Sequence, residues 1–424
     1  MIPLITIQQS FESVIDDCTR GVVDEEDIWV TRRLLNKADD AITEYYDLTI
    51  AKGDHLSYSN VQVTLTPLKS HQYELKLKDD RYIIETGIDV TTIEGTINSI
   101  DAAKSVDTPI VIVAKDFEVA CIDIKEKVIT NQLRLSSKVT SPILKAYLFP
   151  SNKVILTVNL DYSCNIFPLE QTKHEDEGDE DQDEDEDPQP VRTFIGHKKT
   201  ITSLQLIGCK GRNVLTGSKD GKINLWDCGS GTLVKSFYRI DGIDDPVNSI
   251  VLGNIEPLKD QPINNVNEFE TSGICFYAGY QSGIIQQFDI VNHNQTRIKF
   301  KNDDPIVKLI NVENKYLVSG HENGVLSIWS LKTNEKVFQI QFNQDYPISL
   351  IECIELSHHQ DTIKLVIYNG PETLLRLSID LAKSTMDSLH YLVGLPEVFQ
   401  LTDMTVKNNV LYVVGNDGFL YSYR

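Results

Sequence analysis

The sequence has no long hydrophobic run and no secretion signal. Its longest apolar stretches, such as residues 109–114, are far too short to span a bilayer. The N-terminal residues MIPLITIQQS lack a basic region followed by a long apolar core. We therefore expect neither a membrane anchor nor a signal peptide.

Cysteine is sparse and irregularly placed. The seven cysteines form an odd, scattered set without a Cys-x-x-Cys pair. A disulfide framework or a zinc site needs paired or regularly spaced cysteines, so the pattern argues against both. The sequence predicts a protein of a reducing compartment, the cytoplasm and the nucleus.

Basic residues are outnumbered, and the formal net charge is −22. Eleven of the acidic residues lie in HEDEGDEDQDEDED, residues 174–187, and the remaining chain still has 51 acidic against 40 basic residues. Nucleic-acid binding rewards Lys and Arg through counterion release, so we expect no nucleic-acid partner. An acidic body suits a basic protein partner.

The sequence also lacks enzyme and cofactor signatures. The stretch GSKDGK, Gly217–Lys222, has three residues between its glycines where a phosphate loop has four, and Ile223 stands where Ser or Thr should bind Mg²⁺. His358 and His359, with Asp361 nearby, are poor chelators because adjacent side chains on a strand point to opposite faces. We predict no catalytic, cofactor-binding or metal site, and a protein that is not an enzyme.

What the sequence does contain is a repeat, clearest in GHKKTITSLQLIGCKGRNVLTGSKDGKINLWD, residues 196–227. Asp220-Gly221 lies six residues before Trp226, and Thr216 lies ten before it. The same frame recurs, with decreasing clarity, at residues 317–330, 276–290, 411–424, 155–169, 110–124 and 365–380. Seven copies therefore run from about residue 105 to the end.

Each copy is an apolar run, a Gly/Asp/Asn turn and an alternating run, which is typical of short antiparallel strands. Four such strands per repeat, closed radially, predict an all-β, seven-bladed WD40-type β-propeller over residues 91–424. Because the chain ends on a strand at Tyr423, residues 91–100 are expected to supply the outer strand of the last blade.

Residues 1–90 differ from the repeats and predict a small, mostly-β N-terminal domain. Residues 26–46 favour a short helix, whereas residues 61–68 and 71–88 alternate as strands do. The acidic segment 174–190 cannot bury a hydrophobic core, so we expect a disordered insertion between the third and fourth strands of one blade.

Four residues of the clearest repeat suggest either a catalytic group or a structural tetrad: His197, Thr216, Asp220 and Trp226. In the structural interpretation, Asp accepts from His, His reaches the Thr hydroxyl, and that hydroxyl meets the indole N–H. The frame recurs in copies that lack these residues, which a catalytic set would not do. We therefore favour the structural tetrad.

The loops expected on one face of the propeller are acidic and carry aromatic and polar residues. This candidate partner-binding face comprises Asp244, Asp245, Tyr280, Gln281, Asp303, Asp304, His321, Glu322, Asp345 and Tyr346. Such a surface fits a basic protein partner.

Residues 192–251 resemble the WD-repeat proteasomal-ATPase-associated factors. The shared features are Gly-His, then GRNV, Ser-x-Asp-Gly, Leu-Trp, Cys-Gly-x-Gly and Val-Asn-Ser-Ile, and residues 141–156 and 276–290 are similar to the flanking blades. The acidic insertion is unlike the compact loop of that family, and residues 1–90 and 340–424 match only loosely.

The resemblance implies a non-enzymatic chaperone that assembles the base of the proteasome 19S regulatory particle. Its implied partners are the C-terminal domain of a regulatory-particle ATPase subunit, bound through the propeller face, and other base-assembly chaperones. We expect a monomer that needs no cofactor, nucleic acid or membrane. The alternative is a WD40 substrate receptor or histone-binding scaffold that uses the acidic segment to hold basic tails.

Overall fold

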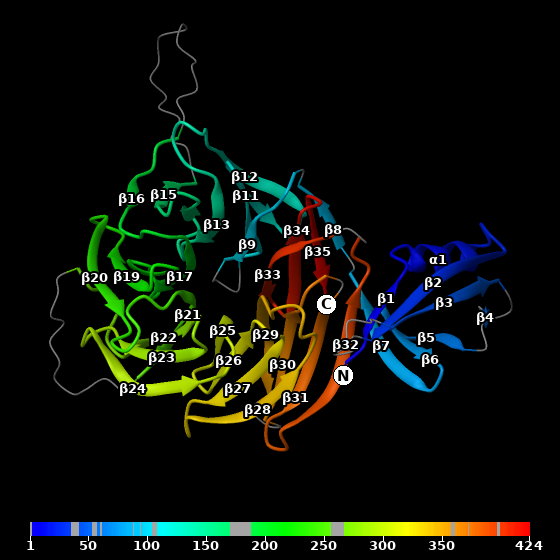
Figure 1. Ribbon diagram of the computed structural model, residues 1–424. Coiled ribbons are helices and arrows are strands. Elements are labelled where there is room, and N and C mark those ends of the chain that lie inside the picture. The colour runs from blue at the N-terminus through cyan, green and yellow to red at the C-terminus, as the bar shows by residue number, and fades with distance from the viewer. Residues whose placement is uncertain are drawn as a thin grey trace, which may run out of the picture.

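The computed structural model confirms an all-β, seven-bladed propeller preceded by a small, mostly-β N-terminal part (Figure 1). It describes residues 2–34, 42–52, 57–59, 62–87, 89–93, 95–103, 108–169, 188–255, 267–357, 361–371, 373–396 and 399–424. Seven four-stranded blades follow one another round a ring, and the first strand of each lines a central channel.

The first four blades are antiparallel sheets of consecutive strands. Blade 1 comprises β9 (Ser99–Ala102), β10 (Ile110–Lys115), β11 (Glu118–Asp123) and β12 (Val128–Arg134). Blade 2 comprises β13 (Ile143–Leu148), β14 (Val154–Asn159), β15 (Cys164–Pro168) and β16 (Arg192–Phe194). Blade 3 comprises β17 (Ile201–Ile207), β18 (Asn213–Ser218), β19 (Lys222–Asp227) and β20 (Thr232–Tyr238). Blade 4 comprises β21 (Val247–Asn254), β22 (Ile274–Tyr280), β23 (Ile284–Asp289) and β24 (Asn294–Lys301).

The last three blades complete the ring. Blade 5 comprises β25 (Ile306–Val312), β26 (Tyr316–His321), β27 (Val325–Ser330) and β28 (Glu335–Gln341). Blade 6 comprises β29 (Leu350–Ser357), β30 (Thr362–Tyr368), β31 (Leu374–Asp380) and β32 (Thr385–Val393). Blade 7 comprises β33 (Leu401–Lys407), β34 (Val410–Gly415), β35 (Phe419–Tyr423) and β8 (Asp89–Thr92).

Ring closure differs in detail from the prediction. β8 pairs antiparallel with β35 as the outer strand of blade 7, but it ends at Thr92. Ser99 and Ile100, the last two residues of the expected closing strand, instead begin β9, the inner strand of blade 1. Ile93 and Ile97, which lie between β8 and β9, are buried.

The inner strands share an irregularity that the repeat frame did not reveal. A β-bulge interrupts the first strand of blades 2, 3, 4, 5 and 7, in front of Lys145, Ser203, Ser249, Lys308 and Asp403. A bulge re-aims the side chain that follows it. All five of these residues line the central channel.

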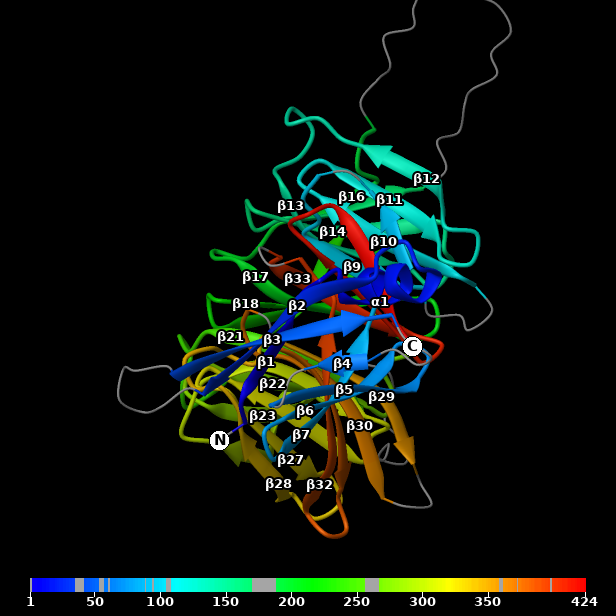
Figure 2. The ribbon, with the colours of Figure 1, turned by 90° about the vertical axis from the view of Figure 1, so that its right-hand side faces the viewer.

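The N-terminal part consists of two groups of strands and one helix among the described residues. β1 (Leu4–Ile7), β2 (Glu25–Leu34), β3 (Ile42–Ala51) and β4 (Ser57–Ser59) form one sheet. β5 (Val63–Lys69), β6 (Gln72–Leu77) and β7 (Asp80–Thr86) extend blade 6 through a parallel pairing of β7 with β32. Figure 2 brings these strands in front of the blades.

Helix α1 (Phe11–Arg20) buries Phe11, Val14 and Cys18. The helix predicted within residues 26–46 is wrong, because two ten-residue strands pair there along their whole length. Within the described parts of the chain, no helix is long and apolar enough to span a bilayer.

The N-terminal part shares a hydrophobic core with blade 6. Phe11, Leu48 and Ile84 belong to the same buried cluster as Leu375 and Leu377. The extension by β7 also covers the outer edge of blade 6, which would otherwise expose unpaired backbone groups. The sheet of blade 6 includes β5, β6 and β7, so it crosses the predicted domain boundary near residue 90. The division into an N-terminal domain and a propeller domain at that residue stays a prediction.

Candidate functional site

The loops of interest lie together on one face of the ring, called here the Gly-His face. Successive strands of a blade run in opposite directions, so two kinds of connection meet there: those between the second and third strands, and those between blades. Gly196-His197 lies in the connection from blade 2 to blade 3. The side chain of His197 contacts Asp220 in the turn between the second and third strands of blade 3.

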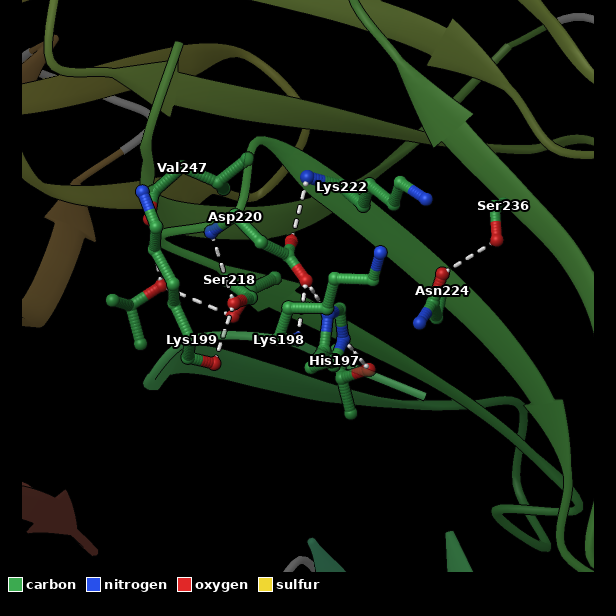
Figure 3. Close-up of polar contacts among 12 residues, drawn as sticks. His197, Lys198, Lys199, Ser218, Asp220, Lys222, Asn224, Ser236 and Val247 are labelled. Atoms are coloured by element: carbon green, nitrogen blue, oxygen red, sulfur yellow. Dashed lines mark hydrogen bonds and ion pairs between the residues drawn. The ribbon is translucent and has the colours of Figure 1, made fainter. Parts of the chain in front are cut away.

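Hydrogen bonds join the four residues of the predicted tetrad, and Figure 3 shows two of them, His197 and Asp220, side by side. Nδ1 of His197 lies 3.1 Å from Oδ2 of Asp220, and Nε2 lies 2.8 Å from Oγ1 of Thr216. The Trp226 indole N–H donates to the same hydroxyl at 2.8 Å. Thr216 has no exposed surface, so its hydroxyl is not accessible to a substrate and the geometry favours a structural role.

Asp220 is the anchor of this arrangement. Its carboxylate also accepts the backbone N–H groups of Lys198 at 2.8 Å and Lys222 at 3.0 Å. Burial by itself raises the pKa of Asp220, but the bonds from His197 and the two backbone groups outweigh it and lower the pKa to about 2. The charged carboxylate therefore fastens the Gly-His loop to the turn.

Blade 5 builds a related arrangement with a histidine from a different place. The Trp329 indole donates to Oγ of Ser319 at 3.3 Å, and that hydroxyl lies 3.0 Å from Nε2 of His321. Nδ1 of His321 faces the backbone carbonyl of Asp304 at 3.4 Å. The prediction that His321 lies on the partner-binding face is wrong: it is 1% exposed, because it ends β26 pointing toward Ser319.

Tyr280 of blade 4 is also misplaced in the predicted face, since it is fully buried. The Arg239 guanidinium lies 5.1 Å from the centre of its ring. Arg239 also pairs with Asp245 at 3.1 Å and donates to the Ser282 hydroxyl at 3.0 Å. Arg239 pairs with Asp241 at 3.1 Å as well, so one guanidinium partly neutralises both aspartates. The sequence analysis missed this arginine, although its short motif RIDGIDD is rich in aspartate.

The remaining face residues form what we call the acidic crescent: Asp244, Gln281, Asp303, Asp304, Glu322, Asp345 and Tyr346. Asp244, Asp303, Glu322 and Asp345 are exposed, and Tyr346 is 41% exposed. Gln281 and Asp304 are half-buried. The crescent follows the Gly-His face from the loop before blade 4 to the loop before blade 6.

A side-chain network ties the crescent to blade 3. The Lys219 ammonium donates to the side-chain oxygen of Asn248, whose amide donates to Gln281 at 3.0 Å. Gln281 in turn donates to Glu322 at 3.3 Å. Burial lowers the pKa of Lys219, and the charge of Glu322 opposes that effect. Three neighbouring blades are therefore linked across this face.

The central channel carries a second charged cluster that sequence analysis missed. A cavity of about 260 Å³ is lined by the charged residues Asp101, Lys145, Lys308, Glu352 and Asp403 from five different blades. Lys145 and Asp403 form an ion pair at 3.6 Å. Burial raises the pKa of Glu352 to about 7, against the attraction of Lys308. The closed ring brings these five residues together, and a bulge precedes three of them, Lys145, Lys308 and Asp403.

Two sequence candidates fall outside the described residues. The acidic run 174–187 is one, although the strands that flank it, β15 and β16, do pair in blade 2. The histidines His358 and His359 are the other. In the described portions of the chain, no group of three or more His, Cys, Asp or Glu residues is arranged to hold a metal ion.

Comparison with known proteins supports the WD-repeat fold. Residues 188–227 match the family described as WD domain, G-beta repeat. The chain is 28% identical over 265 residues to the 26S proteasome regulatory subunit RPN14 of Saccharomyces cerevisiae. The aligned region covers 58% of this chain and 59% of that protein.

Two further similarities are weaker. Eukaryotic translation initiation factor 3 subunit I of Taeniopygia guttata is 28% identical over 146 residues, 31% of this chain and 37% of that protein. A guanine nucleotide-binding protein subunit beta of Oryza sativa subsp. indica is 23% identical over 269 residues, 54% of this chain and 68% of that protein. The chain is thus a WD-repeat propeller similar, over rather more than half its length, to a proteasome regulatory subunit.

Proposed function

We propose that this protein is a non-enzymatic assembly chaperone for the base of the proteasome 19S regulatory particle. The observation that carries the proposal is the similarity to a 26S proteasome regulatory subunit over 58% of the chain. The motif combination GRNV and CGSG in blade 3 points to the same family. The chain spans only 59% of the length of that relative. The choice of partner proposed below therefore rests on the surface of this propeller.

The proposed partner is the C-terminal domain of a regulatory-particle ATPase subunit, held by the acidic crescent. Four exposed carboxylates, those of Asp244, Asp303, Glu322 and Asp345, present negative charge along one rim. The half-exposed ring of Tyr346 offers an aromatic contact among them. Charge complementarity of this kind speeds encounter and selects a basic partner, while an aromatic residue supplies contact area.

The proposed mechanism is steric and thermodynamic. A propeller bound to the ATPase domain hinders premature docking of that subunit's C-terminal tail onto the core particle. Release follows if the docked ATPase binds the propeller less tightly than the free ATPase does, because a ligand shifts an equilibrium only by its difference in affinity. Partners include other base-assembly chaperones, but no cofactor, nucleic acid or membrane. The protein itself is a monomer of the cytoplasm and nucleus.

Charge reversal in the crescent tests the proposal. Purified wild-type protein and the double variant Asp303→Lys with Glu322→Lys are titrated with the C-terminal domain of each regulatory-particle ATPase subunit in turn. We expect one subunit to bind the wild type, and the variant to bind it about tenfold or more weakly, because two rim charges become repulsive. The melting temperature should fall only slightly, since both side chains are exposed and Glu322 loses a single hydrogen bond, the one from Gln281.

The matched control reverses two exposed glutamates on the opposite face, Glu126→Lys with Glu335→Lys. Glu126 lies in the turn between β11 and β12, and Glu335 is the first residue of β28. Equal loss in the control variant would remove the crescent from the site. Absence of binding to every ATPase subunit, or stoichiometric presence of the protein in mature 26S particles, would refute the chaperone proposal.

The basic-tail scaffold is the second candidate, because eleven acidic residues lie within residues 174–187. Deletion of this segment separates the two functions. Retained binding to the ATPase domain favours the chaperone, whereas lost partner binding favours the scaffold.

A further inference from the structure

A basic and apolar patch lies on the Gly-His face of blade 3, beside the acidic crescent. We call it the blade-3 patch, and it comprises Ile195, Lys198, Lys199, Lys222, Tyr238, Ile240 and Ile243. Ile195 is 79% exposed, Ile240 73% and Ile243 55%. Large aliphatic side chains exposed together on a soluble protein commonly mark an interaction site.

Contacts show that the three segments of the patch are neighbours. The backbone of Lys198 donates to Asp220, which joins the Gly-His loop to the turn before β19. A Cβ atom on Gly221 would lie 2.4 Å from the carbonyl oxygen of Ile243, so that turn touches the loop leading to blade 4. Lys222 is directly opposite Tyr238 in the β19–β20 pair. Figure 3 shows Lys198, Lys199 and Lys222 around Asp220.

The lysines of the patch are available to a ligand. Among the described residues, none of the three ammonium groups has a carboxylate within 4.0 Å. The carboxylate of Asp220, whose partners include the backbone of Lys198 and Lys222, is already satisfied by His197 and these two backbone N–H groups. On a protein of net charge −22, an exposed cluster of unneutralised lysines beside isoleucines is a local exception.

We propose that the blade-3 patch is a second docking surface, which binds an acidic segment with large apolar side chains from another protein. The three lysines attract the carboxylates of the partner, and the three isoleucines and Tyr238 pack against its apolar side chains. The chain's own acidic run does not fit, because HEDEGDEDQDEDED contains no aliphatic or aromatic side chain to cover the isoleucines. The adjoining crescent favours the opposite charge, so the two surfaces together fix the orientation of a partner.

The test uses the full-length protein and a labelled synthetic peptide in which glutamates alternate with leucine and phenylalanine. Fluorescence anisotropy at low salt should detect binding that weakens as salt is added. Two control peptides, one with serine in place of the apolar residues and one with lysine in place of glutamate, should each bind about tenfold or more weakly. Failure of the wild-type protein to bind the first peptide better than both controls would overturn the proposal.

Variants locate the site. Lys198→Glu, Lys199→Glu and Lys222→Glu together, and separately Ile195→Ser with Ile240→Ser, should each weaken binding of the acidic apolar peptide about tenfold. The matched control, Lys125→Glu, Lys210→Glu and Lys332→Glu, reverses three exposed lysines on the opposite face and should leave binding unchanged. Equal loss in patch and control variants would contradict the assignment.

Two further outcomes are decisive. Carbodiimide crosslinks between the patch lysines and residues 174–187, formed within the chain alone, would show that its own acidic run covers the patch, and would overturn the proposal. The crescent variant Asp303→Lys with Glu322→Lys should retain peptide binding, which keeps failure of this proposal distinct from failure of the proposed function.

Discussion

Two carboxylates inside the propeller, Asp220 of blade 3 and Glu352 of the central channel, have pKa values shifted in opposite directions. Asp220 accepts hydrogen bonds from His197 and from two backbone N–H groups, and its pKa falls to about 2. No hydrogen bond joins the Glu352 carboxylate to another described residue, and its pKa rises to about 7. Burial raises the pKa of both groups, so the donors decide which carboxylate stays charged.

The comparison separates a structural charge from a responsive one. Asp220 carries its charge at every physiological pH and holds a loop in place. Glu352 shares the channel with the ion pair of Lys145 and Asp403, and changes protonation close to neutrality. Substitutions that remove the charge at the two sites should therefore change the free energy of unfolding in opposite directions.

The largest effect is expected from Asp220→Ala, which strands His197 and two backbone N–H groups. We expect a loss of about 3 kcal/mol in the free energy of unfolding at pH 7, because bonds to a charged group are the strong ones. Urea denaturation measures it. A blade-5 control, Asn323→Ala, removes an amide whose oxygen accepts one backbone N–H at 3.2 Å and should cost less than about 1 kcal/mol.

The pH dependence sharpens this prediction. The folded pKa of Asp220 lies below its ordinary value of 3.8, so its stabilisation is present above about pH 4 and is lost as the pH falls toward about 2. The difference between wild type and Asp220→Ala should shrink over that window. A constant difference would show that the carboxylate charge contributes nothing.

An intermediate effect is expected from His197→Ala, on the order of 1–3 kcal/mol, because the Thr216 hydroxyl and the Asp220 carboxylate each lose a buried partner. His321→Ala in blade 5 should cost less, since its Nδ1 contact is a 3.4 Å approach to a backbone carbonyl. Unchanged stability of the His197 variant in urea denaturation would contradict the tetrad.

The smallest effect, and the opposite sign, is expected from Glu352→Gln. The folded pKa of Glu352 lies above its ordinary value of 4.5, so protonation favours the folded state, and this contribution is lost as the pH rises through about 7. Glutamine mimics the neutral acid, so the variant should match the wild type in stability below about pH 4 and exceed it increasingly as the pH rises from 4.5 to about 7. The exposed control Glu126→Gln should show no such pH dependence. A destabilised Glu352→Gln at pH 8 would reverse the interpretation of the channel.

The propeller fold was predictable because its signals are local. Each repeat places a Gly/Asp/Asn turn between two apolar strands at a constant spacing, and such a hairpin folds in the same way wherever it occurs. The grouping of His197, Thr216, Asp220 and Trp226 rests on the same spacing, and hydrogen bonds join these residues.

The exposure of individual face residues was not predictable in the same way. Tyr280 and His321 occupy turn-proximal positions of the repeat, but each ends a strand with its side chain pointing into the blade. Whether a strand's last residue points outward depends on pleat and twist, which a bulge one strand away can alter.

The sequence by itself determined the number of blades, the antiparallel hairpins and the polar residues that pin blade 3, because these depend on contacts between residues close along the chain. Only the tertiary structure decided that residues 89–92 close the ring and that β7 docks on blade 6. It also decided that five charged residues from five blades share the channel. Those contacts join segments far apart in sequence, so their partners are selected by the geometry of the closed ring.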